Sequence, residues 1–320
     1  MAIDASVVLQ LGGAALLIRA LAGLARWLWL YIWLPQRLNG EHLAERFGPG
    51  SWALITAASD GLGKAFAQDL ARYGFNLILV SRTQSKLDRL KDEMQALGVQ
   101  VRTVAADLSN TAPQTYESLV AAAQDVDLSV LINCVGTTVH RRYGDVPPKT
   151  LRHLMAVNVS TTAIVTHTLL PLLLRHAEST GRRAALLNVG SIVGRFYWPG
   201  TQLYGACKAF IDHLSIPLAY EYRDQLDVLS FQPTVMATAM AAGTEPAAIT
   251  IPPQQAAHAA LSQLGHVLTS HGHWRHGMTA TFLAVLPRGI RNAFLLKQAL
   301  AMGKVELARS EQATESERLL

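Results

Sequence analysis

The sequence predicts an α/β fold, in which a doubly wound parallel sheet is covered by helices on both faces. Short apolar runs alternate with helical stretches from residue 51 onward. These runs are apolar throughout rather than at every second position, which is typical of strands buried on both faces. The chain of 320 residues is long enough for one large domain with extensions at its ends.

The first element is an apolar segment at residues 5–34, interrupted chiefly by Gln10, Arg19 and Arg26 and ending in an aromatic-rich run. It is too long for a signal peptide and lacks a small-residue cleavage site. We therefore expect residues 1–40 to form a membrane anchor, which Pro35 closes. A spanning helix would place Arg19 near mid-bilayer, at a cost of a few kcal/mol. A helix lying in the membrane plane would turn Arg19 and Arg26 toward the headgroups, and both arrangements remain open.

The second region begins after a polar linker at residues 41–50. Strands and helices alternate along it, as in a parallel sheet with crossover helices. The expected strands cover residues 52–56, 75–80, 101–105, 128–134, 184–189 and 228–232. The expected helices cover residues 64–73, 85–97, 115–124, 151–174 and 204–223. Residues 50–240 should form this domain.

The third region, residues 241–306, is a predicted helical extension. A helix is expected at 254–268, and an apolar stretch at 278–300 is divided by Pro287. Arg288 and Arg291 stand near the start of the helix after this proline. A second membrane contact, a lid over an apolar channel and plain packing all fit this stretch. Residues 307–320 are polar and expected to be disordered.

Composition narrows the class of partner. Half of the residues are hydrophobic, only 16% are charged, and the formal net charge is +5. The basic residues are scattered, so nucleic acid is not an expected partner. A membrane surface suits the excess of positive charge better. Cys134 and Cys207 show no disulfide or zinc spacing, and the four histidines between 266 and 276 lack a carboxylate at ligand spacing. No metal site is expected.

A nucleotide site is expected where the first strand ends. Thr56 is followed by a loop with Gly61 and Gly63 and by a helix near Lys64. Glycines let the backbone approach a pyrophosphate, and the helix N-terminus supplies amide donors. The spacing is not G-x-G-x-x-G, so the loop alone is weak evidence. The residues expected to bind the nucleotide here are Ser59, Asp60, Gly61, Leu62 and Gly63.

The end of the second strand favours NADP(H) over NAD(H). Sites specific for NAD place an acidic residue there for the ribose 2′-hydroxyl. This chain has Ser81-Arg82 instead, and a guanidinium matches the geometry of a 2′-phosphate. Asp107 follows the third strand, where it either reaches the adenine amino group or caps the next helix.

Tyr204 and Lys208 are the candidate catalytic pair. Residues four apart lie on one face of a helix, so these side chains can converge. A nearby ammonium stabilises a phenolate, so we expect Lys208 to lower the pKa of Tyr204 and make it a general acid or base. Ser191, thirteen residues earlier, follows a predicted strand and could hold the substrate oxygen.

Across roughly residues 50–240 the chain resembles the short-chain dehydrogenase/reductase family. Within it, the likeness is to the group of 17β-hydroxysteroid dehydrogenases and very-long-chain 3-oxoacyl-CoA reductases. The resemblance rests on six segments in the family's order: the loop from Thr56 to Lys64, Asn133-Cys134-Val135-Gly136, Asn158-Val159, Gly190-Ser191, Tyr204 with Lys208, and Pro233 to Thr238.

The resemblance implies a Rossmann-like fold and a role for each matched residue. Tyr204 would protonate the substrate carbonyl, and Ser191 would orient it. Lys208 would also bind the nicotinamide ribose, and Asn158 would hold a water in the proton relay. The cofactor-binding set would further include Asn133 and Thr238 as well as Tyr204 and Lys208 themselves. Two departures, Ala57 for a usual glycine and Cys134 for a second asparagine, bear on cofactor affinity.

The implied function is NADPH-dependent reduction of a lipid carbonyl at a membrane. Loop residues that suit a lipidic ligand are Val139, Phe196, Tyr197, Trp198 and Met240. The resemblance favours reduction of 3-oxoacyl-CoA to 3-hydroxyacyl-CoA in very-long-chain fatty acid elongation. Oxosteroid reduction and a catalytically weak membrane-tethered scaffold are the alternatives. The resemblance further implies that the protein lies at the endoplasmic reticulum membrane with its catalytic domain in the cytosol. It also implies a homodimer or partners in an elongation complex.

Overall fold

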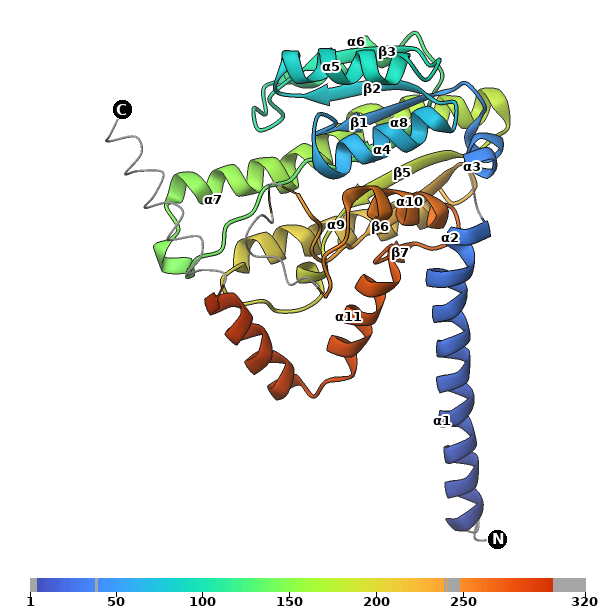
Figure 1. Ribbon diagram of the computed structural model, residues 1–320, viewed down its shortest axis with the longest axis vertical. Helices are drawn as coiled ribbons and strands as arrows, with labels where there is room; N and C mark the ends of the chain where they lie inside the picture. The colour runs from blue at the N-terminus through green and yellow to red at the C-terminus, as the bar shows by residue number, and fades with distance from the viewer. Residues whose placement is uncertain (1–4, 38–39, 239, 241–247, 302–320) are drawn as a thin grey trace.

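The computed structural model describes residues 5–37, 40–238, 240 and 248–301, and its main body is a sheet between two layers of helices (Figure 1). Seven parallel strands follow the order β3-β2-β1-β4-β5-β6-β7. The strands are β1 (Trp52–Thr56), β2 (Asn76–Ser81), β3 (Val101–Ala105), β4 (Leu128–Asn133), β5 (Ala184–Val189), β6 (Leu226–Phe231) and β7 (Thr269–Ser270). The chain reverses direction across the sheet between β3 and β4, which confirms the doubly wound α/β prediction.

Two apolar clusters hold helices to the two faces of the sheet. One face carries α4 (Gly61–Arg72), α5 (Gln84–Gln95) and α10 (Pro253–Gln263), with Phe66, Leu87 and Leu261 in the cluster. The other face carries α6 (Pro113–Ala123), α8 (Thr161–Thr180) and α9 (Gln202–Glu221), with Leu119, Leu169 and Ala219. α8 is preceded by α7 (Pro148–Met155) and a π-helical turn over Ala156–Ser160.

Most predicted elements are present, and the differences have local causes. The linker expected at 41–50 is wrong, because Gly40–Phe47 forms helix α3, which buries Leu43 and Phe47. Strand β7 has only two residues, too few to give a sequence pattern. In the extension, α11 (Trp274–Val285) and a helix over 288–301 flank Pro287.

The prediction that Pro35 closes the N-terminal segment is wrong, because the helix continues past this proline. Helix α1 (Ala5–Leu28) continues through a π-helical turn, Trp29–Trp33, into α2 (Leu34–Arg37). Proline has no N–H, so the bond that it would donate to the residue four earlier cannot form. The wider turn accommodates this loss, because Leu34 donates to the carbonyl of Trp29, five residues back.

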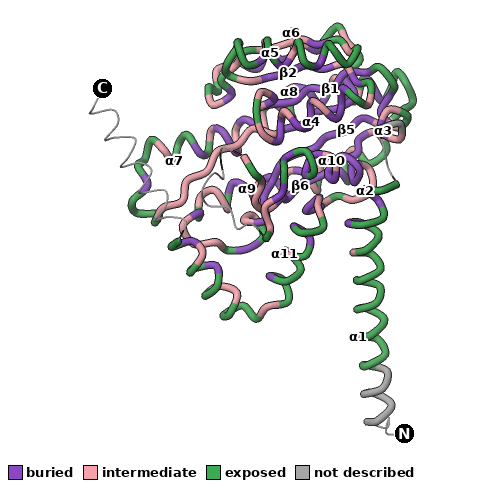
Figure 2. Tube along the Cα trace, in the orientation of Figure 1, coloured by how far each residue is buried: buried purple, intermediate pink, exposed green. Residues whose placement is uncertain are grey.

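The base of this helix is fixed to the body. Leu30, Tyr31 and Leu34 are buried, and Gln263 donates to the Leu30 carbonyl at 2.9 Å. Among the described residues, two helices are long and apolar enough to cross a membrane: Gly12–Arg37 and Pro148–Thr180. The second covers the sheet, whereas α1 extends away from the body and is exposed along its described length (Figure 2).

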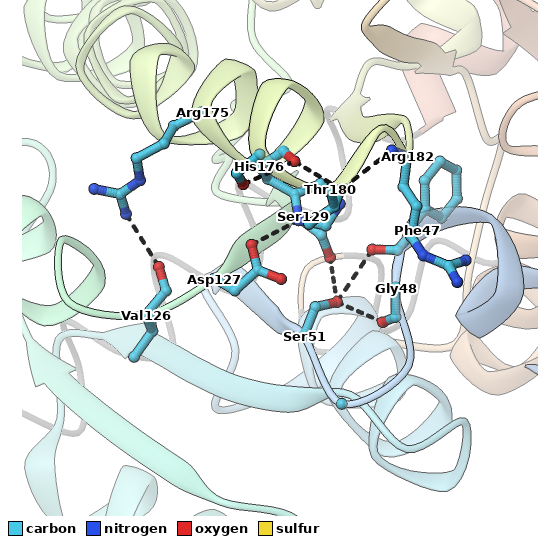
Figure 3. A network of polar contacts seen from close by, with 12 residues as sticks. Phe47, Gly48, Ser51, Val126, Asp127, Ser129, Arg175, His176, Thr180 and Arg182 are labelled. Carbon is cyan, nitrogen blue, oxygen red and sulfur yellow. Dashed lines mark hydrogen bonds and ion pairs between the residues drawn. The ribbon is translucent and has the colours of Figure 1, made fainter.

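A polar network joins α3 to the start of β4 and the end of α8 (Figure 3). The Ser51 hydroxyl donates to the Gly48 carbonyl at 2.7 Å and lies 2.6 Å from the Ser129 hydroxyl. Buried His176 lies 2.6 Å from Asp127 through Nδ1. The network therefore connects the N-terminal extension to the domain core.

A second link from α3 runs through Asp227, at the start of β6. Its carboxylate accepts from Arg46 Nε at 2.6 Å and from Arg183 Nε at 2.7 Å, and its side chain is nearly buried. Removing the charge of one partner costs more in an ion pair shielded from solvent than in an exposed one, because the other charge is left without compensation.

We expect Asp227→Asn to lower the free energy of unfolding by about 2 kcal/mol, because two charge-assisted hydrogen bonds lose their charge. Urea unfolding measures this change. Asp125→Asn is the control, since the Asp125–Arg102 pair is largely exposed and its loss should cost less than about 1 kcal/mol. Equal losses in the two variants would contradict the role given to Asp227.

Candidate active site

The candidate site is a cavity of about 530 Å³ at the carboxyl ends of the strands. Residues that follow β1, β2, β3, β4, β5 and β6 all line it, at the switch point where ligands bind in open α/β sheets. Every predicted catalytic or cofactor-binding residue lines this cavity except Asn133 and Asn158. Of the five loop residues expected to suit a lipidic ligand, Trp198 and Met240 line it, whereas Val139, Phe196 and Tyr197 do not.

The loop after β1 packs tightly against the start of α4. A Cβ at Gly63 would lie 2.2 Å from the carbonyl oxygen of Ala57, so only glycine fits there. Gly61 has φ +51°, and a Cβ there would lie 3.3 Å from the Thr238 methyl. Asp60 caps the helix, with its Oδ1 accepting from the Gly61 N–H at 2.7 Å. The close approach brings the helix N-terminus to the cavity, as an anionic pyrophosphate requires.

Ala57 is strained in this loop. Its φ of +53° is the only positive value at a non-glycine position among the described residues. A Cβ in the left-handed region costs roughly 1–2 kcal/mol. The methyl group therefore leaves the turn in place and stores strain beside the cavity.

Two cations face the end of β2. Arg82 and Lys86 both line the cavity, and Lys86 Nζ lies 3.8 Å from the Asp60 carboxylate. Ser59 and Ser81 meet at 2.6 Å between their hydroxyl oxygens. Sequence reasoning missed Lys86, although its position four residues after Arg82, at a helix start, was an available signal.

Asp107 lines the same cavity beyond β3. Its Oδ1 accepts from the N–H of Ser109 at 3.0 Å and from its hydroxyl at 2.8 Å, so it closes a turn. These hydrogen bonds lower the pKa of Asp107. The alternative that Asp107 caps the next helix is wrong, because α6 begins after Ala112.

Tyr204, Ser191 and Lys208 converge at the end of β5. The Tyr204 side chain hydrogen-bonds to Ser191. Lys208 is buried, its Nζ donates to the Val189 carbonyl at 2.8 Å, and it lies 5.6 Å from the centroid of the Tyr204 ring. A Cβ at Gly194 would lie 2.6 Å from the Lys208 backbone, so glycine lets the loop after Ser191 contact α9.

The expected effect of Lys208 on Tyr204 is wrong for the chain by itself. Burial raises the pKa of Tyr204 to about 12, and the hydrogen bond from Ser191 only partly opposes it. Burial likewise lowers the pKa of Lys208 to about 8. The ammonium is turned toward the Val189 carbonyl rather than the phenol oxygen. Tyr204 is therefore protonated at neutral pH, which is the form that can donate a proton.

Asn158 lies behind the cavity wall, in the π-helical turn between α7 and α8. Its Nδ2 donates to the carbonyls of Thr137 at 2.9 Å and Leu154 at 3.0 Å. A Cβ at Gly136 would lie 3.2 Å from Asn158 Oδ1 and 3.3 Å from Lys208 Nζ, so these two groups approach one point. The π turn directs Asn158 there, as such turns often do at functional sites.

Asn133 does not line the cavity, so the prediction that it contacts the cofactor is corrected. Its buried Nδ2 donates to Thr166 Oγ1 at 2.9 Å and to Asn188 Oδ1 at 2.8 Å, joining β4 to α8 and β5. Asn133 is the last residue of β4, and its side chain lies between the sheet and α8. Cys134, one residue later, lines the cavity instead, and burial raises its pKa to about 12.

The described residues contain no group of three His, Cys, Asp or Glu side chains that could hold a metal ion. Two of the four histidines between 266 and 276, His271 and His276, are buried. His271 hydrogen-bonds to the Gln232 carbonyl and His276 to that of Val235.

Comparison with known proteins agrees with this geometry. The model of the short chain dehydrogenase family matches residues 51–248. The chain belongs to the short-chain dehydrogenase/reductase family. It is an oxidoreductase, and this family uses a nicotinamide cofactor. The glycine loop at a helix N-terminus and the cations beyond β2 fit such a dinucleotide.

The chain is similar to very-long-chain 3-oxoacyl-CoA reductases. It is 32% identical to that of Caenorhabditis elegans over 290 residues, covering 88% of this chain and 89% of the relative. It is 34% identical to that of Coccidioides immitis over 291 residues, covering 87% and 80%.

Solved structures show the same fold. A 7β-hydroxysteroid dehydrogenase has a TM-score of 0.69 at 26% identity, covering 79% of this chain and 98% of that one. A short-chain dehydrogenase of Sphingobium yanoikuyae in complex with NADPH has a TM-score of 0.60 at 27% identity, covering 67% and 84%.

Ala57→Gly should raise the free energy of unfolding by roughly 0.5–1 kcal/mol, because glycine adopts positive φ without the Cβ penalty, although it loses more entropy on folding. Thermal and urea unfolding measure it. Ala58→Gly is the matched control: Ala58 is buried and has no positive φ, so the change should destabilise. A destabilised Ala57→Gly variant would contradict the strain.

Lys208→Met should be more stable than the wild type at pH 7 by roughly 1–3 kcal/mol, an advantage that disappears as the pH rises from about 8 past 10.5. The folded pKa lies below the unfolded one, so the penalty of burying the ammonium is fully present below pH 8 and is relieved above 10.5. Urea unfolding at pH 7 and above pH 10.5 measures the difference in stability between the variant and the wild type. Lys64→Met controls for loss of a surface lysine. An advantage that persists at high pH would contradict the assignment.

Proposed function

We propose that the protein is a membrane-associated, NADPH-dependent carbonyl reductase that converts a long-chain 3-oxoacyl-CoA to the 3-hydroxyacyl-CoA. The observation that carries this proposal is the half-buried Tyr204, hydrogen-bonded to buried Ser191 beside Lys208, at the wall of a large cavity with a nucleotide loop at its other side. The similarity to 3-oxoacyl-CoA reductases over most of the chain supports the choice of substrate.

The cofactor preference follows from the residues beyond β2. Arg82 and Lys86 place two cations at the cavity, and no carboxylate of β2 stands where a ribose 2′-hydroxyl would need one. A guanidinium and an ammonium suit a 2′-phosphate. Gly61 and Gly63 would receive the pyrophosphate, and Thr238, over Gly61, would close this side.

The reduced nicotinamide supplies a hydride to the carbonyl carbon when it is bound. The Tyr204 phenol donates its proton to the carbonyl oxygen, which becomes the alcohol, and Ser191 holds that oxygen by hydrogen bonding. The phenolate left behind is stabilised by the Lys208 ammonium. Asn158, at the back of the same group, would hold the water through which the proton is replaced.

A cluster of cations near the cavity favours an acyl-CoA over an oxosteroid. His140 and His153 line the cavity, and the segment between them contains Arg141, Arg142, Lys149 and Arg152. Within the described chain, none of these four forms an ion pair with a carboxylate, and Asp145 is the segment's only acidic residue. Coenzyme A carries several phosphate charges, whereas an oxosteroid carries none. A steroid remains the second candidate because of the similar 7β-hydroxysteroid dehydrogenase structure.

The membrane is the proposed location. Helix α1 is apolar and about 36 Å long, enough for a hydrocarbon core of about 30 Å, and its described side chains are exposed except for half-buried Trp27. We place the protein at the endoplasmic reticulum membrane with its catalytic domain in the cytosol, where an elongation complex or a second copy would be its partner. The intact catalytic group argues against a scaffold without turnover.

Tyr204→Phe should reduce the rate of NADPH oxidation with a long-chain 3-oxoacyl-CoA at least 100-fold, because the proton donor is lost. Its folding should be preserved, since the ring remains. The decrease of NADPH absorbance with time measures the rate, and thermal unfolding measures the folding. Unchanged turnover would contradict the mechanism, and no nucleotide binding in the wild type would favour the scaffold.

The substrate assignment is tested in the same assay with Arg142→Glu. The KM for the acyl-CoA should rise, while the KM for an oxosteroid should stay unchanged. Asp145→Asn is a control in the same segment. Faster turnover of oxosteroids than of acyl-CoAs in the wild type would contradict the assignment, and a preference for NADH would contradict the role of Arg82.

A further inference from the structure

The C-terminal extension presents apolar side chains to solvent on an unusual scale. On α11, Met278, Phe282 and Val285 are 52%, 53% and 72% exposed, and Trp274 precedes them on the same helix face. On the helix over 288–301 the exposed apolar residues are Ile290, Phe294, Leu296 and Leu300. Large apolar patches of this kind mark interaction surfaces. We call α11 and this second helix the C-terminal hairpin.

The α11 stripe is one face of an amphipathic helix. Residues 274, 278, 282 and 285 follow a helical period, and the opposite face is buried through His276, Gly277, Ala280 and Leu283. A Cβ at Gly277 would lie 2.6 Å from the Tyr31 ring, so α11 packs directly on the base of the N-terminal helix. Within the described chain, α11 thus already packs on the body through its other face, and the exposed stripe is free to contact a partner.

The hairpin and α1 extend from the same side of the body (Figure 1), away from β2, β3 and α5. Figure 2 shows α1 and the outer part of α11 as exposed. Since both leave the body near Tyr31, a membrane that receives α1 also meets the tip of the hairpin, around Pro287.

Charge supports a lipid surface as the partner. Residues 248–301 contain no Asp or Glu, and their Lys and Arg residues are Arg275, Arg288, Arg291 and Lys297. Residues 5–40 likewise contain arginines and no acidic residue. Arg288 lies 5.9 Å over the Tyr197 ring and Arg291 5.4 Å over the Phe196 ring, so near the tip both cations turn back from the apolar end. Cations that reach back to headgroups from an apolar tip are typical of helices at anionic membranes.

We propose that the C-terminal hairpin is a second membrane contact, which inserts its apolar stripe into an anionic bilayer beside α1. A second copy of the chain fits less well, because a positively charged surface without acidic residues would repel itself. Thr279 of α11, with Ile249 and Met240, lines the catalytic cavity. On the proposed function, an acyl chain would therefore enter the cavity next to the bilayer, but the membrane contact does not depend on this.

The test places an environment-sensitive fluorophore on the full-length protein through Phe282→Cys or Val285→Cys. The protein is reconstituted in phosphatidylcholine vesicles with roughly 30% phosphatidylglycerol, with and without a quencher on the acyl chains. Leu97→Cys is the matched control, an exposed apolar position after α5 on the far side of the body. Wild-type protein gives the background, because Cys207 is buried and burial raises the pKa of Cys134.

We expect the lipid quencher to reduce emission from positions 282 and 285 several-fold more than emission from position 97, and more strongly with the anionic lipid than without it. Quenching no greater than at position 97 would overturn the proposal. Emission that resists the lipid quencher but depends on protein concentration would assign the surface to a second copy and would also overturn it. None of these readings uses catalysis, so failure of the proposed carbonyl reduction would leave them unchanged.

Discussion

The site is organised around a buried ammonium at the end of β5. Lys208 is held by a hydrogen bond to the Val189 carbonyl, and its charge is maintained against a burial that lowers its pKa to about 8. Gly194 and Gly136 lack the side chains that would fill the space around it, so the loop after Ser191 and the π turn bearing Asn158 can approach. Replacing that charge with an apolar group would suit packing better, which is why its presence indicates chemistry rather than stability.

The protonation states of Tyr204 and Lys208 follow from the same burial. A phenol that is removed from water retains its proton, and an amine that is removed from water releases one more readily. The pKa values of the two groups, which are close together in water, are thus driven apart, to about 12 for Tyr204 and about 8 for Lys208. This arrangement suits a donor that transfers one proton and a cation that stabilises what remains.

The direction of the N-terminal helix relative to the body is determined at its base. Leu30, Tyr31 and Leu34 are buried, while the residues before them are exposed. The π turn before Pro35 lets the helix continue through this contact instead of ending at it. As a result, the direction of α1 is coupled to α10 and α11, and the cavity faces a defined side of the molecule.

Much of the fold and site could be predicted from local patterns. Strand runs that are apolar throughout determine burial on both faces, and Tyr204 and Lys208 lie on one helix face because of their spacing alone. Asp60, Gly61 and Arg82 were identifiable because they stand at the ends of predicted strands, where a sheet of this class binds ligands. The sequence thus determined the fold class, the glycine loop at the start of α4 and the placing of Tyr204 and Lys208 on one helix face.

The tertiary structure decided what depends on neighbours distant in the sequence. Asn133 is a brace because Thr166 and Asn188 meet it, and no property of residue 133 alone distinguishes this from a cofactor contact. The pKa of Tyr204 rises because many segments exclude water around it, which the nearby lysine spacing could not reveal. Helix α3 forms where the sequence reads as polar, because its apolar side is covered by the domain. Periodicity is a local property, whereas burial and the partner of each polar group are set by the whole fold.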